Sequence, residues 1–162
     1  MRKPKTVADA IDRLQGLCAR SEQCSEDMQR KLVNWMIPTP DADKINARLK
    51  KERFIDDARF ARAYARDKLL FSGWGQYKIM RGLMMKRIPR DLIDDAIDSL
   101  EPDEITETAE RVLRSKARSI KEGNTYEGRT KLFRFGASRG FDTKLLGNLI
   151  RHHDLWAEPD ED

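Results

Sequence analysis

The stretch KRIPRDLIDDAI, residues 86–97, decides the fold of this chain. Pro89 is typical of a first helical turn, and after it the apolar side chains recur at intervals of three and four residues. One face of the resulting helix carries Leu92, Ile93, Ala96, Ile97 and Leu100, whereas Asp94, Asp95 and Asp98 lie on the opposite face. Such a helix has to bury its apolar face against neighbours. The stretch therefore predicts an amphipathic helix in a helical protein.

The same periodicity occupies most of the chain, and almost no stretch alternates as a β-strand would. Residues that cap helices or stand in their first turn, such as Ser25, Asp56 and Pro102, divide the chain into segments. Nine helices are predicted, at about residues 6–19, 25–36, 41–51, 56–71, 75–86, 89–100, 103–121, 127–138 and 142–153. The predicted fold class is therefore all-α.

The opening stretch also has a counterpart later in the chain. Residues 139–150, RGFDTKLLGNLI, align with it at an offset of 53 residues. The alignment pairs Ile88 with Phe141, Leu92 with Leu145, Ile93 with Leu146 and Ile97 with Ile150, and a looser one pairs Leu32 with Leu83. We predict three tandem three-helix repeats, at residues 1–52, 53–101 and 102–153, followed by a disordered acidic tail at 154–162. Because each repeat of such an array contacts only its neighbours, an elongated and curved protein is expected.

The charge distribution favours an acidic or polyanionic partner. Lysine and arginine number 32 against 28 aspartates and glutamates, and residues 105–153 alone contain eleven basic and five acidic residues. Basic proteins of this kind often bind nucleic acid or an acidic protein surface. No segment approaches about 18 consecutive apolar residues, and the first residues lack the apolar core of a signal peptide. We therefore expect a cytoplasmic protein that does not enter a membrane, with Cys18 and Cys24 as reduced thiols.

No group of residues predicts catalysis or metal binding. Asp56 and Asp57 are adjacent, and neighbouring helix residues point about 100° apart, so a helix N-cap followed by a first-turn acid explains them better than an acid pair. The aspartates between 91 and 98 have the spacing of a solvated helix face, without the glycine-turned loop of a calcium site. His152 and His153 are the only histidines, and no further ligands stand beside them. We predict no enzymatic activity, no catalytic residue, no metal and no cofactor.

Basic residues recur at helical spacing on successive predicted helices. A single stripe is usually a solvated face, but several stripes along one array indicate a binding surface for a polyanion. The candidate surface comprises Arg59, Arg62, Arg66, Lys68, Trp74, Lys78, Arg81, Lys86, Arg87, Arg90, Arg111, Arg114, Arg118, Arg134 and Arg139. Phe60 and Tyr64 have the spacing of core residues, whereas Trp74 stands between two glycines and is the aromatic side chain that we expect to be exposed. A stand-alone helical-repeat protein that binds nucleic acid would fit this pattern.

Three motifs, in this order along the chain, resemble those of the RecX family of regulatory proteins. The first, ERFIDDARFARAYARDKL (residues 52–69), matches the family pattern at Phe54, Ile55, Asp56, Asp57, Phe60, Ala61 and Tyr64. The second matches at Gly75, Lys78, Ile79 and Leu83, and the third at Arg139, Gly140 and Phe141. Residues 19–32 also resemble a family stretch, although Met28 stands where a leucine is common.

The resemblance implies a regulator without chemistry of its own, built from three three-helix repeats. Such a protein binds the RecA recombinase in the groove of the RecA–DNA filament and usually inhibits strand exchange, ATPase and co-protease activity. The candidate surface is then expected to contact RecA and also single- or double-stranded DNA, and we expect a monomer.

Two positions depart from the family pattern. Gly82 stands where the family carries a polar helix former, which should cost the helix about 0.5 to 1 kcal/mol relative to alanine. Arg87 replaces the glycine of a Lys-Gly-Ile turn, so we expect the backbone to differ there.

Overall fold

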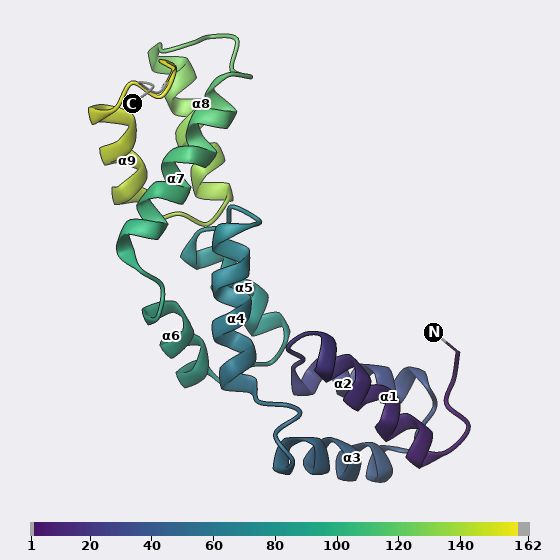
Figure 1. Ribbon diagram of the computed structural model, residues 1–162. Coiled ribbons are helices and arrows are strands. Elements are labelled where there is room, and N and C mark those ends of the chain that lie inside the picture. The colour runs from purple at the N-terminus through teal and green to yellow at the C-terminus, as the bar shows by residue number, and fades with distance from the viewer. Residues whose placement is uncertain (1, 159–162) are drawn as a thin grey trace. The chain divides into compact units, whose positions relative to one another are not determined.

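The computed structural model describes residues 2–158, and it confirms the all-α fold. Within these residues the chain forms nine helices and no strand (Figure 1). The helices are α1 (Val7–Arg20), α2 (Ser25–Asn34), α3 (Thr39–Lys51), α4 (Asp57–Leu70), α5 (Gln76–Met85), α6 (Arg90–Asp98), α7 (Pro102–Ala117), α8 (Tyr126–Ser138) and α9 (Thr143–His152). Each lies where the hydrophobic periodicity predicted a helix, although α7 ends four residues before its predicted end at residue 121.

The described residues fall into two compact units. Unit 1 contains those of Met1–Ala63 and Leu83–Asp94, and unit 2 contains those of Tyr64–Gly82 and Asp95–Asp162. The three-helix repeats with boundaries after residues 52 and 101 stay a prediction.

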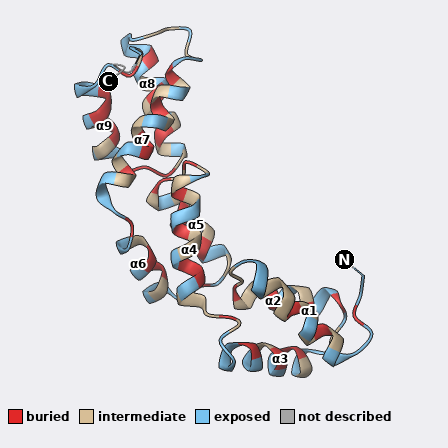
Figure 2. Ribbon diagram, in the orientation of Figure 1, coloured by how far each residue is buried: buried red, intermediate tan, exposed pale blue. Residues whose placement is uncertain are grey.

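The core of unit 1 is built from apolar positions of its first three helices. Leu14 of α1, Met28 and Leu32 of α2 and Leu49 of α3 are fully buried. Figure 2 shows buried positions, in red, on all three helices. Ala10, Trp35, Ala42, Ile45 and Ile55 complete the same cluster. Burying one leucine side chain contributes about 1.5 to 3 kcal/mol, so this cluster supplies much of the stability of the unit.

Asp57, the first residue of α4, also caps the N-terminus of α2. The carboxylate accepts hydrogen bonds from the Ser25 backbone N–H at 2.9 Å and from the Ser25 hydroxyl at 2.6 Å. The cap residue of α2, Cys24, makes no side-chain cap hydrogen bond, so Asp57 takes that role from 32 residues away. Asp56 caps its own helix as predicted, because it accepts a hydrogen bond from the Arg59 N–H at 3.0 Å. Neither aspartate is arranged as one of an acid pair.

The same left-handed turn follows four described helices, α2, α3, α5 and α8. Met36 (φ 60°), Arg53 (φ 60°), Arg87 (φ 53°) and Gly140 (φ 91°) occupy it. The next residue in each case, Ile37, Phe54, Ile88 or Phe141, donates its N–H to the carbonyl of Leu32, Leu49, Leu83 or Gly136 at 3.0, 2.9, 3.2 or 3.3 Å. The turn after α5 corrects our expectation for Arg87, whose backbone keeps the left-handed conformation that favours glycine.

Replacing Arg87 with glycine should stabilise the protein by about 0.5 to 1 kcal/mol. Glycine removes the steric cost of a Cβ at positive φ, although it also gains entropy in the unfolded chain. The ion pair to Glu26 is lost, but at 3.7 Å, with the Arg87 side chain 81% exposed, it contributes little. Urea unfolding followed by circular dichroism measures the change. Arg87→Ala, which keeps the Cβ and also loses the ion pair, should show no gain, and an equal gain in both variants would contradict the explanation.

The core of unit 2 includes residues of α7, α8 and α9. Leu113, Leu132 and Leu146 are fully buried, one from each helix. Gly136 of α8 permits the close approach, because an added Cβ would lie 2.5 Å from Leu146 Cδ2 and 3.1 Å from Leu113 Cδ2.

The segment after α9 packs on α7. Leu155 is buried, and Arg114 Nη1 donates to the carbonyls of Asp154 and Ala157 at 2.9 and 3.2 Å. The predicted disordered tail therefore does not begin at residue 154, and its remainder, residues 159–162, lies outside the described residues.

Gly82 of α5 makes room for a neighbouring aromatic ring. An added Cβ would overlap with the Tyr64 hydroxyl and would lie 3.1 Å from the Tyr64 Cζ. The sequence indicated only a helix-propensity cost at this position, whereas the structure adds a steric requirement for a residue without a side chain.

Candidate interaction surface

The connection between α4 and α5, residues 71–75, is fixed to the turn between α8 and α9 by the main chain. Gly75 donates its N–H to the carbonyl of Arg139 at 2.8 Å, and Tyr77 donates to the carbonyl of Gly140 at 3.0 Å. The two backbones are so close that a Cβ on Gly75 would overlap with the Gly140 carbonyl. Two glycines of separate sequence motifs therefore meet, and their contact positions Trp74 and Arg139.

Trp74 lies between lysines and aromatic edges in unit 2. The ammonium groups of Lys68 and Lys78 lie 4.6 and 4.7 Å from its ring centroid. The Tyr64 ring meets it edge-to-face, with centroids 6.4 Å apart and planes at 72°. Trp74 is half-buried rather than exposed, which corrects the expectation for this side chain. Each cation–π contact contributes about 0.5 to 1 kcal/mol at such a site, so both lysines are held in place.

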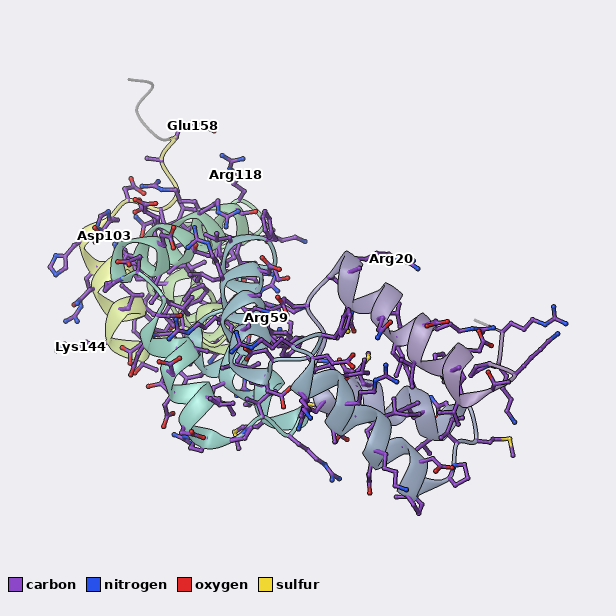
Figure 3. The ribbon with its side chains drawn as sticks, turned by 60° about the horizontal axis from the view of Figure 1, so that its bottom comes forward. Arg20, Arg59, Asp103, Arg118, Lys144 and Glu158 are labelled. Carbon is purple, nitrogen blue, oxygen red and sulfur yellow. The ribbon has the colours of Figure 1, made fainter. Side chains whose placement is uncertain are left out.

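Ion pairs divide the cations of the predicted basic surface, apart from Arg62, into two classes. Within residues 2–158, seven of its cations pair with carboxylates: Arg59 with Glu22, Arg66 with Glu104, Lys86 with Asp27, Arg87 with Glu26, Arg90 with Asp94, Arg114 with Glu110 and Arg118 with Glu158. Figure 3 labels Arg118 and Glu158, whose charged groups are 3.8 Å apart. Pairs on the surface add little stability, but each cancels a positive charge that an anionic partner would otherwise meet.

The second class consists of cations that form no ion pair with a carboxylate of the described residues. They are Lys68, Lys78, Arg81, Arg111, Arg134 and Arg139. All six belong to unit 2. The positive charge of the candidate surface is therefore concentrated in one of the two units.

The family-motif residues lie in the hydrophobic cores and at contacts between helices and turns. Ile79 and Leu83 are fully buried, Phe60 and Phe141 are buried, and Phe54 and Tyr64 are half-buried. Arg59, although predicted on the surface, donates to the carboxylate of Glu22 and to the carbonyl of Arg53 at 3.2 Å. We assign Arg59 a structural role, together with Asp56, Asp57, Gly75 and Gly140.

The sequence reasoning missed Lys116 of α7. Its ammonium group lies 5.0 Å from the Phe135 ring centroid, over the ring that the Arg139 guanidinium also approaches, at 5.3 Å. Lys116 lies two residues from both Arg114 and Arg118, off the face they share, so helical spacing alone did not select it.

Other kinds of site find little support in the described part of the chain. No cluster of three His, Cys, Asp or Glu residues there could hold a metal ion, and no helix there is long and apolar enough to cross a membrane. Cys18 and Cys24 are both free, and burial raises the pKa of the Cys24 thiol to about 11. Such a thiol stays protonated at neutral pH and is a poor nucleophile.

Comparison with known proteins links the helices to a family. The family model described as "RecX, second three-helix domain" matches residues 56–97. Two crystal structures share the fold. One, of regulatory protein RecX, gives a TM-score of 0.80 at 22% identity, covering 91% of this chain and 72% of the other. The second, of RecX from Lactobacillus salivarius, gives a TM-score of 0.78 at 17% identity, covering 92% of this chain and 97% of the other.

Curated relatives share more of the sequence over a shorter length. Regulatory protein RecX of Clostridium beijerinckii is 31% identical over 111 residues, which is 67% of this chain and 51% of that protein. Its counterpart in Clostridium botulinum (strain Eklund 17B / Type B) is 30% identical over 105 residues, 64% of this chain and 49% of that protein. The chain thus spans about half the length of the curated relatives it matches. On these matches, and with the fold they share, the chain belongs to the RecX family of regulatory proteins.

Proposed function

We propose that this protein binds RecA and RecA–DNA filaments and inhibits strand exchange, ATPase and co-protease activity of the recombinase. The family supports a regulatory role, and the motifs at residues 52–69, 75–83 and 139–141 support the RecA connection. The observation that carries the proposal to particular residues is the set of six cations of unit 2 that no described carboxylate neutralises.

Unpaired cations suit a filament partner for an electrostatic reason. A filament on DNA is a polyanion, and a cation that contacts phosphate releases condensed counterions, which favours binding. A cation that is already paired has to give up its carboxylate first, so it gains less. We therefore expect Lys68, Lys78, Arg81, Arg111, Arg134 and Arg139 to contribute more to binding than the seven paired cations, with Trp74 holding two of the lysines in position.

Replacing Lys78 and Arg81 together by glutamine should weaken RecA inhibition by about tenfold or more. The double variant removes two unpaired cations of α5 and leaves its buried face intact. The measurement is ATP hydrolysis by RecA on single-stranded DNA at increasing concentrations of the purified protein, read as the concentration for half-inhibition. A tenfold change corresponds to about 1.4 kcal/mol.

The matched control is Arg87→Gln with Arg90→Gln, which removes the same charge from two paired and exposed positions. Its half-inhibition concentration should stay within about twofold of the wild-type protein. The assignment of the surface is wrong if both double variants behave alike. The proposed function itself fails if the wild-type protein leaves RecA ATP hydrolysis unchanged at every stoichiometry.

A stand-alone nucleic-acid-binding protein is the second candidate, favoured by the same unpaired cations. It would bind DNA without RecA, with an affinity that falls with salt by about 0.7 to 0.9 log units per log unit for each phosphate contact. Strong DNA binding together with no effect on RecA would favour this candidate over the first.

A further inference from the structure

Unit 2 contains a cationic pocket that shares Arg111 and Arg139 with the candidate surface and adds Lys116. It has a volume of about 370 Å³ and is formed by residues 71–73, by the α7 residues from Arg111 to Lys116, by Ser119 after that helix, and by Phe135 and Arg139. Three cations line it, Arg111, Lys116 and Arg139, and no aspartate or glutamate among residues 2–158 does. This composition distinguishes the pocket from the neighbouring cavity under residues 155–158, which has three glutamates in its wall.

The three cations are positioned by contacts other than ion pairs. Arg111 Nη2 donates to the Leu70 carbonyl at 3.1 Å. The Lys116 ammonium and the Arg139 guanidinium both lie over the Phe135 ring, 5.0 and 5.3 Å from its centroid. None of the three pairs with a carboxylate of residues 2–158. Like charges held together without a counter-charge repel one another, and an anion in the pocket would remove that repulsion.

Uncharged groups add hydrogen-bond donors to the wall of the pocket. Ser72 and Ser115 add hydroxyl groups to the wall, whereas the Ser119 hydroxyl already donates to the Lys116 carbonyl at 2.8 Å. The wall thus offers several donors and calls for a ligand that is rich in acceptors.

An exposed aromatic ring narrows the class of ligand. Phe71 lines the same pocket and is 83% exposed, so its ring is accessible to a ligand. Bases of nucleotides stack on such rings. Phosphoryl groups match guanidinium forks in shape and charge. A phosphoryl group carried by a base therefore fits the pocket better than a peptide carboxylate does.

We propose that the pocket formed by Arg111, Lys116 and Arg139 binds the phosphoryl group of a nucleotide, with the base against Phe71. The phosphoryl group belongs either to a single strand of nucleic acid or to a free nucleotide, and both present the same chemistry to the pocket. This site does not depend on RecA, so it can be tested with the protein alone.

The test uses the full chain and three probes: a fluorescent ten-residue oligothymidylate, ATP and pyrophosphate. Arg111→Gln with Lys116→Gln should weaken oligothymidylate binding by tenfold or more in fluorescence anisotropy. It should also lower the slope of log affinity against log salt by about 1.4, since each phosphate contact on a single strand contributes about 0.7. The matched control, Arg118→Gln with Lys131→Gln, removes the same charge from paired cations of the same unit and should change affinity by less than threefold.

Phe71→Ala provides a second, independent reading. It should weaken oligothymidylate binding by at least threefold and leave pyrophosphate binding, measured by calorimetry, unchanged. Displacement of the oligothymidylate by ATP assigns the site to free nucleotides, and displacement only by a longer strand assigns it to nucleic acid; either result supports the site. The proposal is overturned if the Arg111 and Lys116 variant binds like the wild-type protein or like its control, or if no probe binds at low salt.

Discussion

Replacing Gly140 with alanine should lower the free energy of unfolding by about 3 kcal/mol or more. Two costs add at this position. The backbone has φ 91°, where side chains are strained, and an added Cβ would lie 2.5 Å from Lys78 Cβ and still closer to the Lys78 backbone N. The neighbour is main chain, which cannot move aside without breaking the hydrogen bond from the Tyr77 N–H to the Gly140 carbonyl. Overpacking and backbone strain together account for the expected size.

Urea unfolding followed by far-ultraviolet circular dichroism measures this loss. Gly16→Ala is the matched control, because nothing lies within 4 Å of a Cβ at Gly16 in α1. That variant should be more stable than the wild-type protein by about 0.5 to 1 kcal/mol, the difference in helix propensity. A Gly140→Ala variant within 1 kcal/mol of wild type would show that the contact between the two turns is looser than the structure has it.

Replacing Gly82 with alanine should destabilise the protein by about 2 kcal/mol, against the direction of helix propensity. Alanine is the better helix former by about 0.5 to 1 kcal/mol, but its Cβ would overlap with the Tyr64 hydroxyl. Removing that hydroxyl should therefore change the outcome. In a Tyr64→Phe background, the nearest ring atom is Cζ at 3.1 Å, so Gly82→Ala should cost less than 1 kcal/mol.

A double-mutant cycle over the four proteins gives the coupling between positions 64 and 82. We expect a coupling of about 1 to 2 kcal/mol from urea unfolding. Equal effects of Gly82→Ala in both backgrounds would assign the glycine to some other cause, such as flexibility of α5.

Much of the fold could be predicted from the sequence, because amphipathic helices show themselves through local spacing. The predicted end of α7, at residue 121, was wrong, and the reason is also local. Ile120 continues the apolar spacing, but Ser119 and Ile120 donate to carbonyls only three residues back, those of Lys116 and Ala117, so the helix tightens and stops. Hydrophobic periodicity cannot distinguish a turn of α-helix from a tighter turn with hydrogen bonds three residues back.

The candidate site was less predictable, because it depends on which cations are paired. The ion pair between Arg90 and Asp94 joins residues four apart in the sequence, so their spacing could have predicted it. The partners in the other two pairs are far apart in the sequence: 59 residues separate Lys86 from Asp27, and 38 separate Arg66 from Glu104. Only the folded chain brings them together. The same holds for Asp57, whose bond to Ser25 crosses 32 residues. The steric role of Gly82 likewise required knowing where the Tyr64 ring lies.

The contact between Gly75 and Gly140 fixes the backbone of this surface independently of the side chains that the surface presents. Main-chain atoms make this contact, and main-chain atoms do not depend on which side chains stand next to them. The side chains at residues 74 and 139, one beside each glycine, can therefore be replaced while the Cα positions stay the same. A protein engineer could alter what this surface recognises by substitution at those two residues, provided that the two glycines are left alone.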